Sequence, residues 1–183
     1  MKILGFAGSL RENSFNKKVV RFTLKLAEEQ GVKTEFLDLR DLNIPLYDGD
    51  LEESSFPESV EVFKEKIRTA DAILISSPEY NHASPGVLKN ALNWSSRPYG
   101  DAAFDGKLIG LMTASPGNRG GALALIDLKA SFEEMGARVY PKTVSIPGVV
   151  QVLDKKGNVI DPDLVEMVKG FLSGLLSSAK KLK

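Results

Sequence analysis

The stretch AILISSPEYNHASPGVLKNALNW, residues 72–94, decides the fold of this chain. Its first six residues, Ala72–Ser77, are continuous, mostly apolar and partly β-branched, which predicts a strand covered on both faces within a parallel sheet. Ser84 and Pro85 have the residue types of a helix N-cap and a first helical residue. The apolar face of that helix consists of Val87, Leu88, Ala91 and Leu92. Between strand and helix lie residues 78–83, at the carboxyl end of the strand, where ligands bind in open α/β sheets.

The N-terminus has the same order of strand, polar loop and helix. Lys2–Ala7 is apolar, and after a polar loop the residues with helical spacing are Phe15, Val19, Phe22 and Leu26. The groups suited to an anion are Ser9, Arg11, Ser14 and Asn16. A helix start adds unpaired backbone N–H groups, so this loop predicts a phosphate site. In the alternative interpretation, Asn13 or Ser14 only caps the helix and Arg11 is solvated. Neither a dinucleotide fingerprint nor a P-loop is present.

The remaining chain continues the alternation of strands and helices. A strand over residues 107–114 precedes the glycine-rich loop SPGNRGG, residues 115–121, and a helix with Leu125, Leu128 and Phe132 on one face. Glycines there allow backbone amides to approach a flat or anionic ligand, or else form an ordinary flexible turn. Residues 34–39 predict the second strand and 137–146 the last one. The strands with polar or glycine-rich loops at their ends are the first, third and fourth.

Several connecting segments are also predicted. Residues 43–56 form a surface loop, and Pro57 begins a helix. The buried stripe of this helix is Val60, Phe63 and Ile67, with Glu61, Lys64, Glu65 and Arg68 outside. Residues 95–105 are irregular and either cover a ligand or meet a partner. Residues 149–159 suggest a small hairpin, and Asp161 with Pro162 begins the last helix, whose apolar face is Val165, Val168, Leu172, Leu175 and Leu176.

Composition narrows the possible functions. The chain has 183 residues and equal numbers of acidic and basic residues, 24 each, so we expect one domain over 1–183 and neither nucleic acid nor a membrane surface as partner. No apolar run reaches membrane-spanning length, and Ile3–Ala7 is too short for a signal-peptide core, which favours a cytoplasmic protein. The chain has no cysteine and one histidine, His82, which excludes thiol nucleophiles and histidine-rich metal sites.

In a sheet of order 2-1-3-4-5, the first, third and fourth strands are neighbours, so their three loops would face one crevice. An anion site beside an aromatic-bearing edge with amide groups suits a phosphorylated, flat heteroaromatic cofactor. FMN fits this arrangement better than ATP.

Three segments resemble one known family. GSLRENSFN at Gly8–Asn16, PEYNHASPGVLKNALNW at Pro78–Trp94 and SPGNRGG at Ser115–Gly121 look like the NADPH-dependent FMN reductases, a group that includes bacterial quinone and chromate reductases. The resemblance covers nearly the whole chain, including IPLYD at 44–48 and GNVID at 157–161. It implies a flavodoxin-like three-layer α/β sandwich, with a five-stranded parallel sheet of order 2-1-3-4-5 and helices on both faces.

The resemblance also implies which residues bind FMN. The phosphate-binding group consists of Ser9, Arg11, Ser14 and Asn16, with Phe15 lining the loop. The segment beside the isoalloxazine consists of Pro78, Glu79, Tyr80, Asn81 and His82. The other edge of the ring is closed by Ser115 and Gly117. His82 departs from the aromatic residue that relatives often have at this position, so a loop histidine without a catalytic task is the preferred interpretation there.

The implied activity is an FMN-dependent NAD(P)H oxidoreductase with ping-pong hydride transfer through bound FMN. NADPH or NADH is the donor, and quinones, chromate, azo compounds or free flavin are possible acceptors. No catalytic acid or base and no metal is needed. Arg119 is a candidate nicotinamide-phosphate or interface residue, or a solvated one. A homodimer or homotetramer is expected, because relatives place the flavin near a subunit interface and Tyr99 and Phe104 lie on irregular backbone.

Three other function classes fit the sequence less well. A flavodoxin-type electron carrier shares the fold and FMN without nicotinamide turnover, but such carriers are strongly acidic and this chain is neutral. A phosphate-receiving signalling domain needs acidic residues at the strand ends, where this chain has Ala7-Gly8-Ser9 and Ser76-Ser77-Pro78. A hydrolase is disfavoured because neither Ser9 nor Ser115 lies in G-x-S-x-G.

Overall fold

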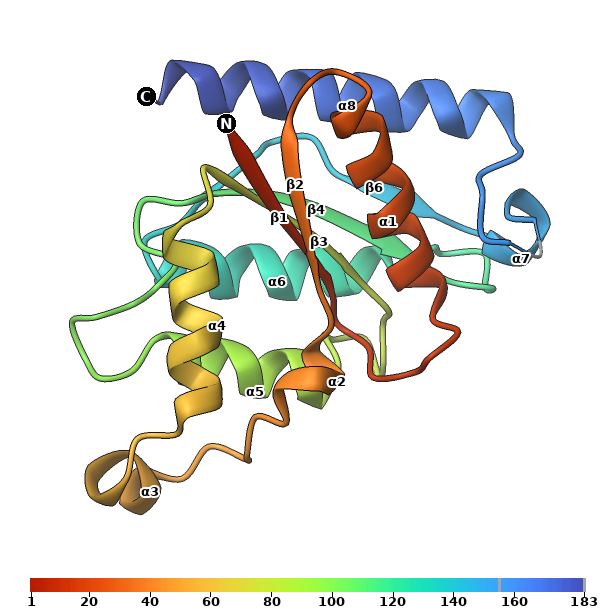
Figure 1. Ribbon diagram of the computed structural model, residues 1–183. Coiled ribbons are helices and arrows are strands. Elements are labelled where there is room, and N and C mark those ends of the chain that lie inside the picture. Colours follow the sequence, from red (N-terminus) through yellow and green to blue (C-terminus); the bar gives the residue numbers. More distant parts are fainter. Residues whose placement is uncertain (155, 183) are drawn as a thin grey trace.

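A parallel β-sheet lies between two layers of helices (Figure 1). The computed structural model describes residues 1–154 and 156–182. Its strands are β1 (Lys2–Ala7), β2 (Lys33–Leu37), β3 (Ala72–Ser77), β4 (Leu108–Ala114), β5 (Arg138–Val139) and β6 (Val144–Ile146). Its helices are α1 (Phe15–Glu28), α2 (Leu39–Leu42), α3 (Gly49–Ser54), α4 (Glu58–Arg68), α5 (Gly86–Ser95), α6 (Ala122–Glu134), α7 (Val149–Val152) and α8 (Pro162–Lys181).

The strand order is β2-β1-β3-β4-β5, with the named strands paired in parallel, and this confirms the predicted order. The prediction of one last strand is wrong. β5 and β6 both pair with β4, and Pro141 lies between them. Proline has no backbone N–H to donate to a ladder, so the edge of the sheet is interrupted there.

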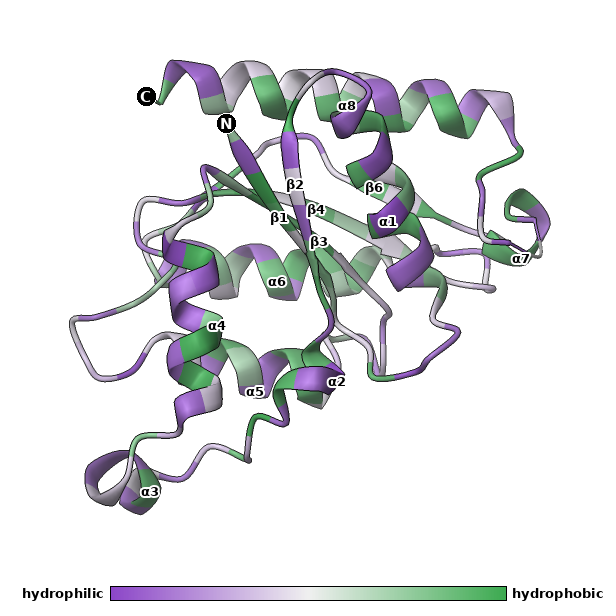
Figure 2. Ribbon diagram, viewed as in Figure 1, coloured by the Kyte–Doolittle hydropathy of each residue, from purple (hydrophilic) through white to green (hydrophobic). Residues whose placement is uncertain are grey.

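Helices cover both faces of the sheet, as predicted. α1 and α8 pack on one face, whereas α4, α5 and α6 pack on the other. Every residue of β3 is buried, which agrees with its continuous apolar sequence. Figure 2 shows hydrophobic residues along much of the central strands and a mixture of hydrophobic and hydrophilic residues on the helices, as expected for helices with one buried face. Among the helices of the described ranges, none is both long and apolar enough to cross a membrane.

Two predicted boundaries move because carboxylates cap helices. The second strand ends at Leu37, since the Asp38 side chain accepts a hydrogen bond from the Arg40 N–H and begins α2. The predicted loop over 43–56 contains α3, where the Asp48 carboxylate accepts from the Asp50 N–H. The acids of this segment therefore begin a helix instead of lining an irregular loop.

Near residue 150, part of the predicted hairpin is replaced by helix. Residues 149–152 form α7, and one antiparallel bridge, between Leu153 and Val159, is all that corresponds to the hairpin in the part of this segment that is described. Lys155 lies outside the described residues. The cap predicted for the last helix is confirmed, because the Asp161 carboxylate accepts from the Leu164 N–H at 3.0 Å.

Two side chains predicted to face outward are buried. Lys64 of α4 has no exposed surface, since its ammonium donates to the Arg97 carbonyl and to the Asp101 carboxylate. Phe104 is also fully buried, packed edge-on against Phe132 of α6. Phe104 therefore belongs to the core and is not available to a partner.

Candidate cofactor site

Loops at the carboxyl ends of β1, β3 and β4 meet at one cavity of about 120 Å³. Its lining consists of Ser9, Arg11, Ser14, Phe15, Asn16, Pro78, Glu79, Tyr80, Ala114, Ser115 and Pro116. Most residues of the predicted FMN site are thus brought together. The remaining three, Asn81, His82 and Gly117, lie on the same loops but do not line this cavity.

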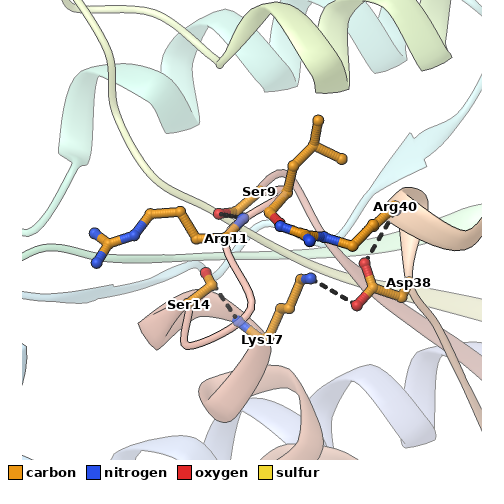
Figure 3. A network of polar contacts seen from close by, with 7 residues as sticks. Ser9, Arg11, Ser14, Lys17, Asp38 and Arg40 are labelled. Carbon is orange, nitrogen blue, oxygen red and sulfur yellow. Dashed lines mark hydrogen bonds and ion pairs between the residues drawn. The ribbon is translucent and has the colours of Figure 1, made fainter. Parts of the chain in front are cut away.

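The first loop carries its polar side chains in two different states. Ser9 and Ser14 are each only 4% exposed, whereas Arg11 is exposed. The Ser14 hydroxyl accepts a hydrogen bond from the Lys17 N–H and caps α1. Of the two residues that could cap this helix, Ser14 is therefore the one that does so, and Asn13 is not. Figure 3 shows the Arg11 guanidinium pointing away from the Lys17–Asp38 ion pair, so it is free to turn toward a ligand.

Two contacts of charged side chains join residues 10–17 to the segment after β2, and the sequence did not predict them (Figure 3). The Lys17 ammonium lies 2.6 Å from the Asp38 carboxylate, and the lysine side chain is only 6% exposed. The Arg40 guanidinium donates to the Leu10 carbonyl, at 2.8 Å through Nε. Asp38 follows β2 directly and Arg40 lies two residues further on, so charged residues just after a strand were the available signal.

Asn16 lies at the centre of the site but its amide serves the scaffold. Its Oδ1 accepts from the Ser76 hydroxyl at 2.7 Å and from the Ala114 N–H at 3.0 Å. Its Nδ2 donates to the Ala114 carbonyl at 3.0 Å. One buried side chain therefore joins the start of α1 to the ends of β3 and β4.

The second loop is a tight turn. Tyr80 and Ala83 exchange two backbone hydrogen bonds, of 3.0 and 3.1 Å. Asn81 and His82 between them both have positive φ, at 51° and 68°, which is the geometry of a type I′ turn. His82 is exposed at the tip of this turn.

Residues on both sides of this turn contact α6. The Glu79 carboxylate accepts from the backbone N–H groups of Leu123 and Ala124. The prediction that Ser84 caps α5 is wrong, because α5 starts at Gly86 and its N-cap residue is Pro85. The Ser84 N–H donates to the Asp127 carboxylate of α6 at 2.9 Å. Partial burial raises the pKa of Asp127, but the hydrogen bonds from Ser84 and the nearby Lys89 charge outweigh it, and the pKa is lowered overall.

The third loop is held by the neighbouring edge of the sheet. The Ser115 N–H donates to the Ile146 carbonyl at 3.0 Å, and the Ser115 hydroxyl accepts from the Gly117 N–H at 3.1 Å. Arg119 is exposed, and its carbonyl accepts from the Ser145 hydroxyl at 3.2 Å. This contact involves only the Arg119 backbone, so it assigns no role to the guanidinium.

The residues present fit FMN in two respects. Two buried hydroxyls, a guanidinium and the first N–H groups of α1 surround the cavity, which is the donor set that a phosphate monoester needs. The cavity is much smaller than the roughly 300–1,000 Å³ of clefts that enclose a drug-sized ligand. It therefore suits the phosphate end of the cofactor.

Comparisons with known proteins agree with this chemistry. The family model described as NADPH-dependent FMN reductase matches residues 1–151. An NAD(P)H-dependent FMN reductase of Pseudomonas aeruginosa is 35% identical over 100% of this chain and 97% of its own length. A quinone reductase of Escherichia coli is 36% identical, with the same coverage of both chains. The solved structure of FerB, a flavoenzyme NAD(P)H:(acceptor) oxidoreductase from Paracoccus denitrificans, has a TM-score of 0.87 and 34% identity, covering 98% of this chain and 97% of that one.

Proposed function

This chain belongs to the NADPH-dependent FMN reductase family, and from that premise we propose that it passes electrons from NAD(P)H through bound FMN to quinones. Family membership identifies FMN and NAD(P)H as its cofactors and makes it an oxidoreductase. The electron-carrier alternative loses support, since these relatives are named as reductases.

The observation that carries the proposal is the meeting of three loops at one cavity whose lining includes Ser9, Arg11, Ser14, Tyr80 and Ser115. We assign Ser9, Arg11 and Ser14 to the FMN phosphate. The charged guanidinium of Arg11 supplies a two-point hydrogen bond, and the dipole of α1 favours the negative charge. Asn16 is reassigned from ligand to support, because its amide already binds Ser76 and Ala114.

When bound, FMN would supply the redox chemistry, which is hydride transfer from the nicotinamide and electron transfer to the acceptor. The residues of this chain bind and orient. The phosphate-binding groups hold one end of the cofactor, and the loops around Tyr80 and Ser115 hold the other. Orientation and exclusion of water are the contributions that such a site makes, and no side chain has to move a proton.

Quinones are the preferred acceptor class because a quinone reductase is 36% identical to this chain over nearly the full length of both. Chromate, azo compounds and free flavin remain alternatives to be compared in the same assay. A cytoplasmic location, where NAD(P)H is available, belongs to the same proposal.

The experiment is anaerobic mixing of the FMN-loaded protein with NADPH or NADH, followed by addition of a benzoquinone. The flavin absorbance should fall with the nicotinamide and return with the quinone, and double-reciprocal plots at several quinone concentrations should be parallel. If FMN binds but neither nicotinamide reduces it within minutes, the reductase function is wrong and the electron-carrier function replaces it.

We further propose that residues 1–183 act as one domain and that the enzyme is a homodimer or homotetramer. Tyr99 supports an interface, because it is 94% exposed, whereas Phe104 no longer does. Light scattering over a wide concentration range should give a multiple of 19.9 kDa. A monomer mass throughout would exclude the oligomer.

A further inference from the structure

The loop over residues 78–84 and helix α6 are joined by two carboxylates, one from each side. The Glu79 carboxylate, on the loop, accepts from the Leu123 N–H at 2.8 Å and from the Ala124 N–H at 3.3 Å. The Asp127 carboxylate, on α6, accepts from the Ser84 N–H at 2.9 Å. Loop and helix are thus each donor and acceptor to the other.

Helix α6 has no N-cap side chain of its own to accept hydrogen bonds from its first N–H groups. Its N-cap residue is Gly121, which has φ 87° and no side chain to accept from the first N–H groups. Unpaired N–H groups at a helix start are costly when they are removed from water, and a carboxylate there is favoured by the helix dipole. Glu79 performs the capping from another loop, 44 residues earlier than Leu123.

The start of α6 is itself fixed to the sheet. A Cβ on Gly121 would lie 3.0 Å from the Cβ of Thr113 in β4, which shows how closely the helix start approaches the strand. A Cβ on Gly120 would lie 2.4 Å from the Ser145 hydroxyl of β6. Since packed strands and helix starts deform little, Glu79 is bonded to a rigid support.

The two carboxylate contacts flank the turn that enters the candidate site. Glu79 precedes the turn and Ser84 follows it, and the turn itself is closed by the hydrogen bonds between Tyr80 and Ala83. Tyr80 is 51% exposed and lines the cavity together with Ser115, which precedes α6. The loops after β3 and β4 therefore share one support and form one wall of the cavity.

We propose that Glu79 and Asp127 are positioning residues that hold this wall in place for the flavin ring, an inference that rests on the proposed function. Neither carboxylate needs to touch FMN. Glu79 acts through Tyr80 and the turn, and Asp127 acts through the backbone of Ser84. The sequence-based assignment placed Glu79 in the segment beside the isoalloxazine, and the inference adds a role for its carboxylate.

This role predicts a distinctive pattern of ligand affinities. Because the wall lies on the ring side of the site, loosening it should weaken FMN and riboflavin alike. Loss of the phosphate contact of Arg11 should instead weaken FMN alone. A residue that matters only for folding would lower the melting temperature and leave both affinities at 25 °C unchanged.

The test is fluorescence titration of FMN and of riboflavin into the apo-forms of the wild type, Glu79→Ala, Glu79→Gln and Asp127→Asn. For Glu79→Ala we expect roughly tenfold weaker binding of both ligands, since two hydrogen bonds to a charged group are lost. Glu79→Gln keeps one acceptor oxygen and should lie between Ala and wild type. The double variant Glu79→Ala/Asp127→Asn should lose less than the sum of the two single changes, because both act on the same wall.

The matched control is Glu133→Ala, an exposed glutamate near the other end of α6, which should bind both ligands as the wild type does. The visible circular dichroism of bound flavin should change in Glu79→Ala and not in this control. Unchanged affinities in Glu79→Ala, or a loss for FMN alone, would overturn the inference. If the wild type binds no FMN, the proposed function and this inference both fail. If the wild type binds FMN and only the Glu79→Ala result differs from expectation, the inference alone fails, so the two failures are distinguishable.

Discussion

Polar groups gather at two edges of the sheet: the carboxyl edge, where the parallel strands end, and the amino edge, where they begin. The polar groups have different uses at the two edges. At the carboxyl edge, the hydroxyls of Ser9 and Ser14 and the guanidinium of Arg11 line a cavity. At the amino edge, the Lys64 ammonium is fully buried and bonded to the Arg97 carbonyl and the Asp101 carboxylate. The first group presents hydrogen-bonding capacity to a ligand, whereas the second uses its capacity within the protein.

The volumes of the hollows, taken alone, point to the amino edge. A hollow of about 730 Å³ lies at the amino edge, between the segment 96–105 and the end of α6, and it is far larger than the cavity of about 120 Å³ at the carboxyl edge. Its acidic residues include Asp101, which already binds Lys64 and Arg68. The chemistry of the lining, and its place at the ends of β1, β3 and β4, identify the functional edge.

The largest effect is expected for Asn16. This residue lies at the carboxyl edge, but its side chain hydrogen-bonds within the protein, as the groups at the amino edge do. Asn16→Ala leaves the Ser76 hydroxyl and both backbone groups of Ala114 without their partner. The cost should be about 3–5 kcal/mol in the free energy of unfolding, since each buried unpaired group costs about 1–3 kcal/mol. Urea unfolding of the apoprotein measures it. The exposed Asn13→Ala is the control and should stay within about 0.5 kcal/mol of wild type; a similar value for Asn16→Ala would contradict the scaffold role.

The next effect tests the amino edge. Lys64→Ala removes a fully buried side chain and leaves the Arg97 carbonyl without its donor, while Asp101 keeps Arg68 as a partner. Because Asp101 retains a partner and partial hydration, the loss should be about 2–4 kcal/mol in unfolding free energy. FMN affinity should not change. Lys66→Ala, on the same helix with a partly exposed ion pair, is the control and should cost about 1 kcal/mol or less. A weaker affinity for FMN in Lys64→Ala would show that the two edges are coupled.

The functional edge itself is tested by Arg11→Ala. Loss of a charge-assisted contact should weaken FMN by about 1.5–3 kcal/mol, and riboflavin, which has no phosphate, should bind nearly as before. Unfolding free energy should be unchanged, since the side chain is exposed. Fluorescence titration with the two ligands measures the difference. Equal losses for FMN and riboflavin would remove Arg11 from the phosphate site.

The sequence predicted what depends on nearby residues. The apolar run of β3, the helical spacing in α1 and α8 and the strand order were all read correctly, because periodicity and turn residues are local signals. It did not predict the burial of Lys64, whose carboxylate partner lies 37 residues away. It also missed that Glu79 caps a helix 44 residues later. Which polar side chain faces a ligand and which meets a distant partner is decided by packing, which spacing does not encode.

The smallest effect sharpens the comparison through pH. The hydrogen bond from Lys64, with a further one from Arg68, lowers the pKa of Asp101, although partial burial opposes this. A carboxyl whose pKa is lower in the folded than in the unfolded state contributes stability above its ordinary value of about 4, and this is lost as the pH falls through the folded-state pKa. Asp101→Asn should therefore reduce the difference in unfolding free energy between pH 6 and pH 3.

The effect should be small, because the Asp101 side chain is 53% exposed and water screens its ion pairs. Urea unfolding at the two pH values measures it, with Asp105→Asn as the control from the same segment. In the Lys64→Ala background, Asp101→Asn should have less effect still, since the largest cause of the lowered pKa is gone. An undiminished effect there would mean that Arg68, and not the buried lysine, holds the carboxylate, so the amino edge would be stabilised by its exposed ion pair.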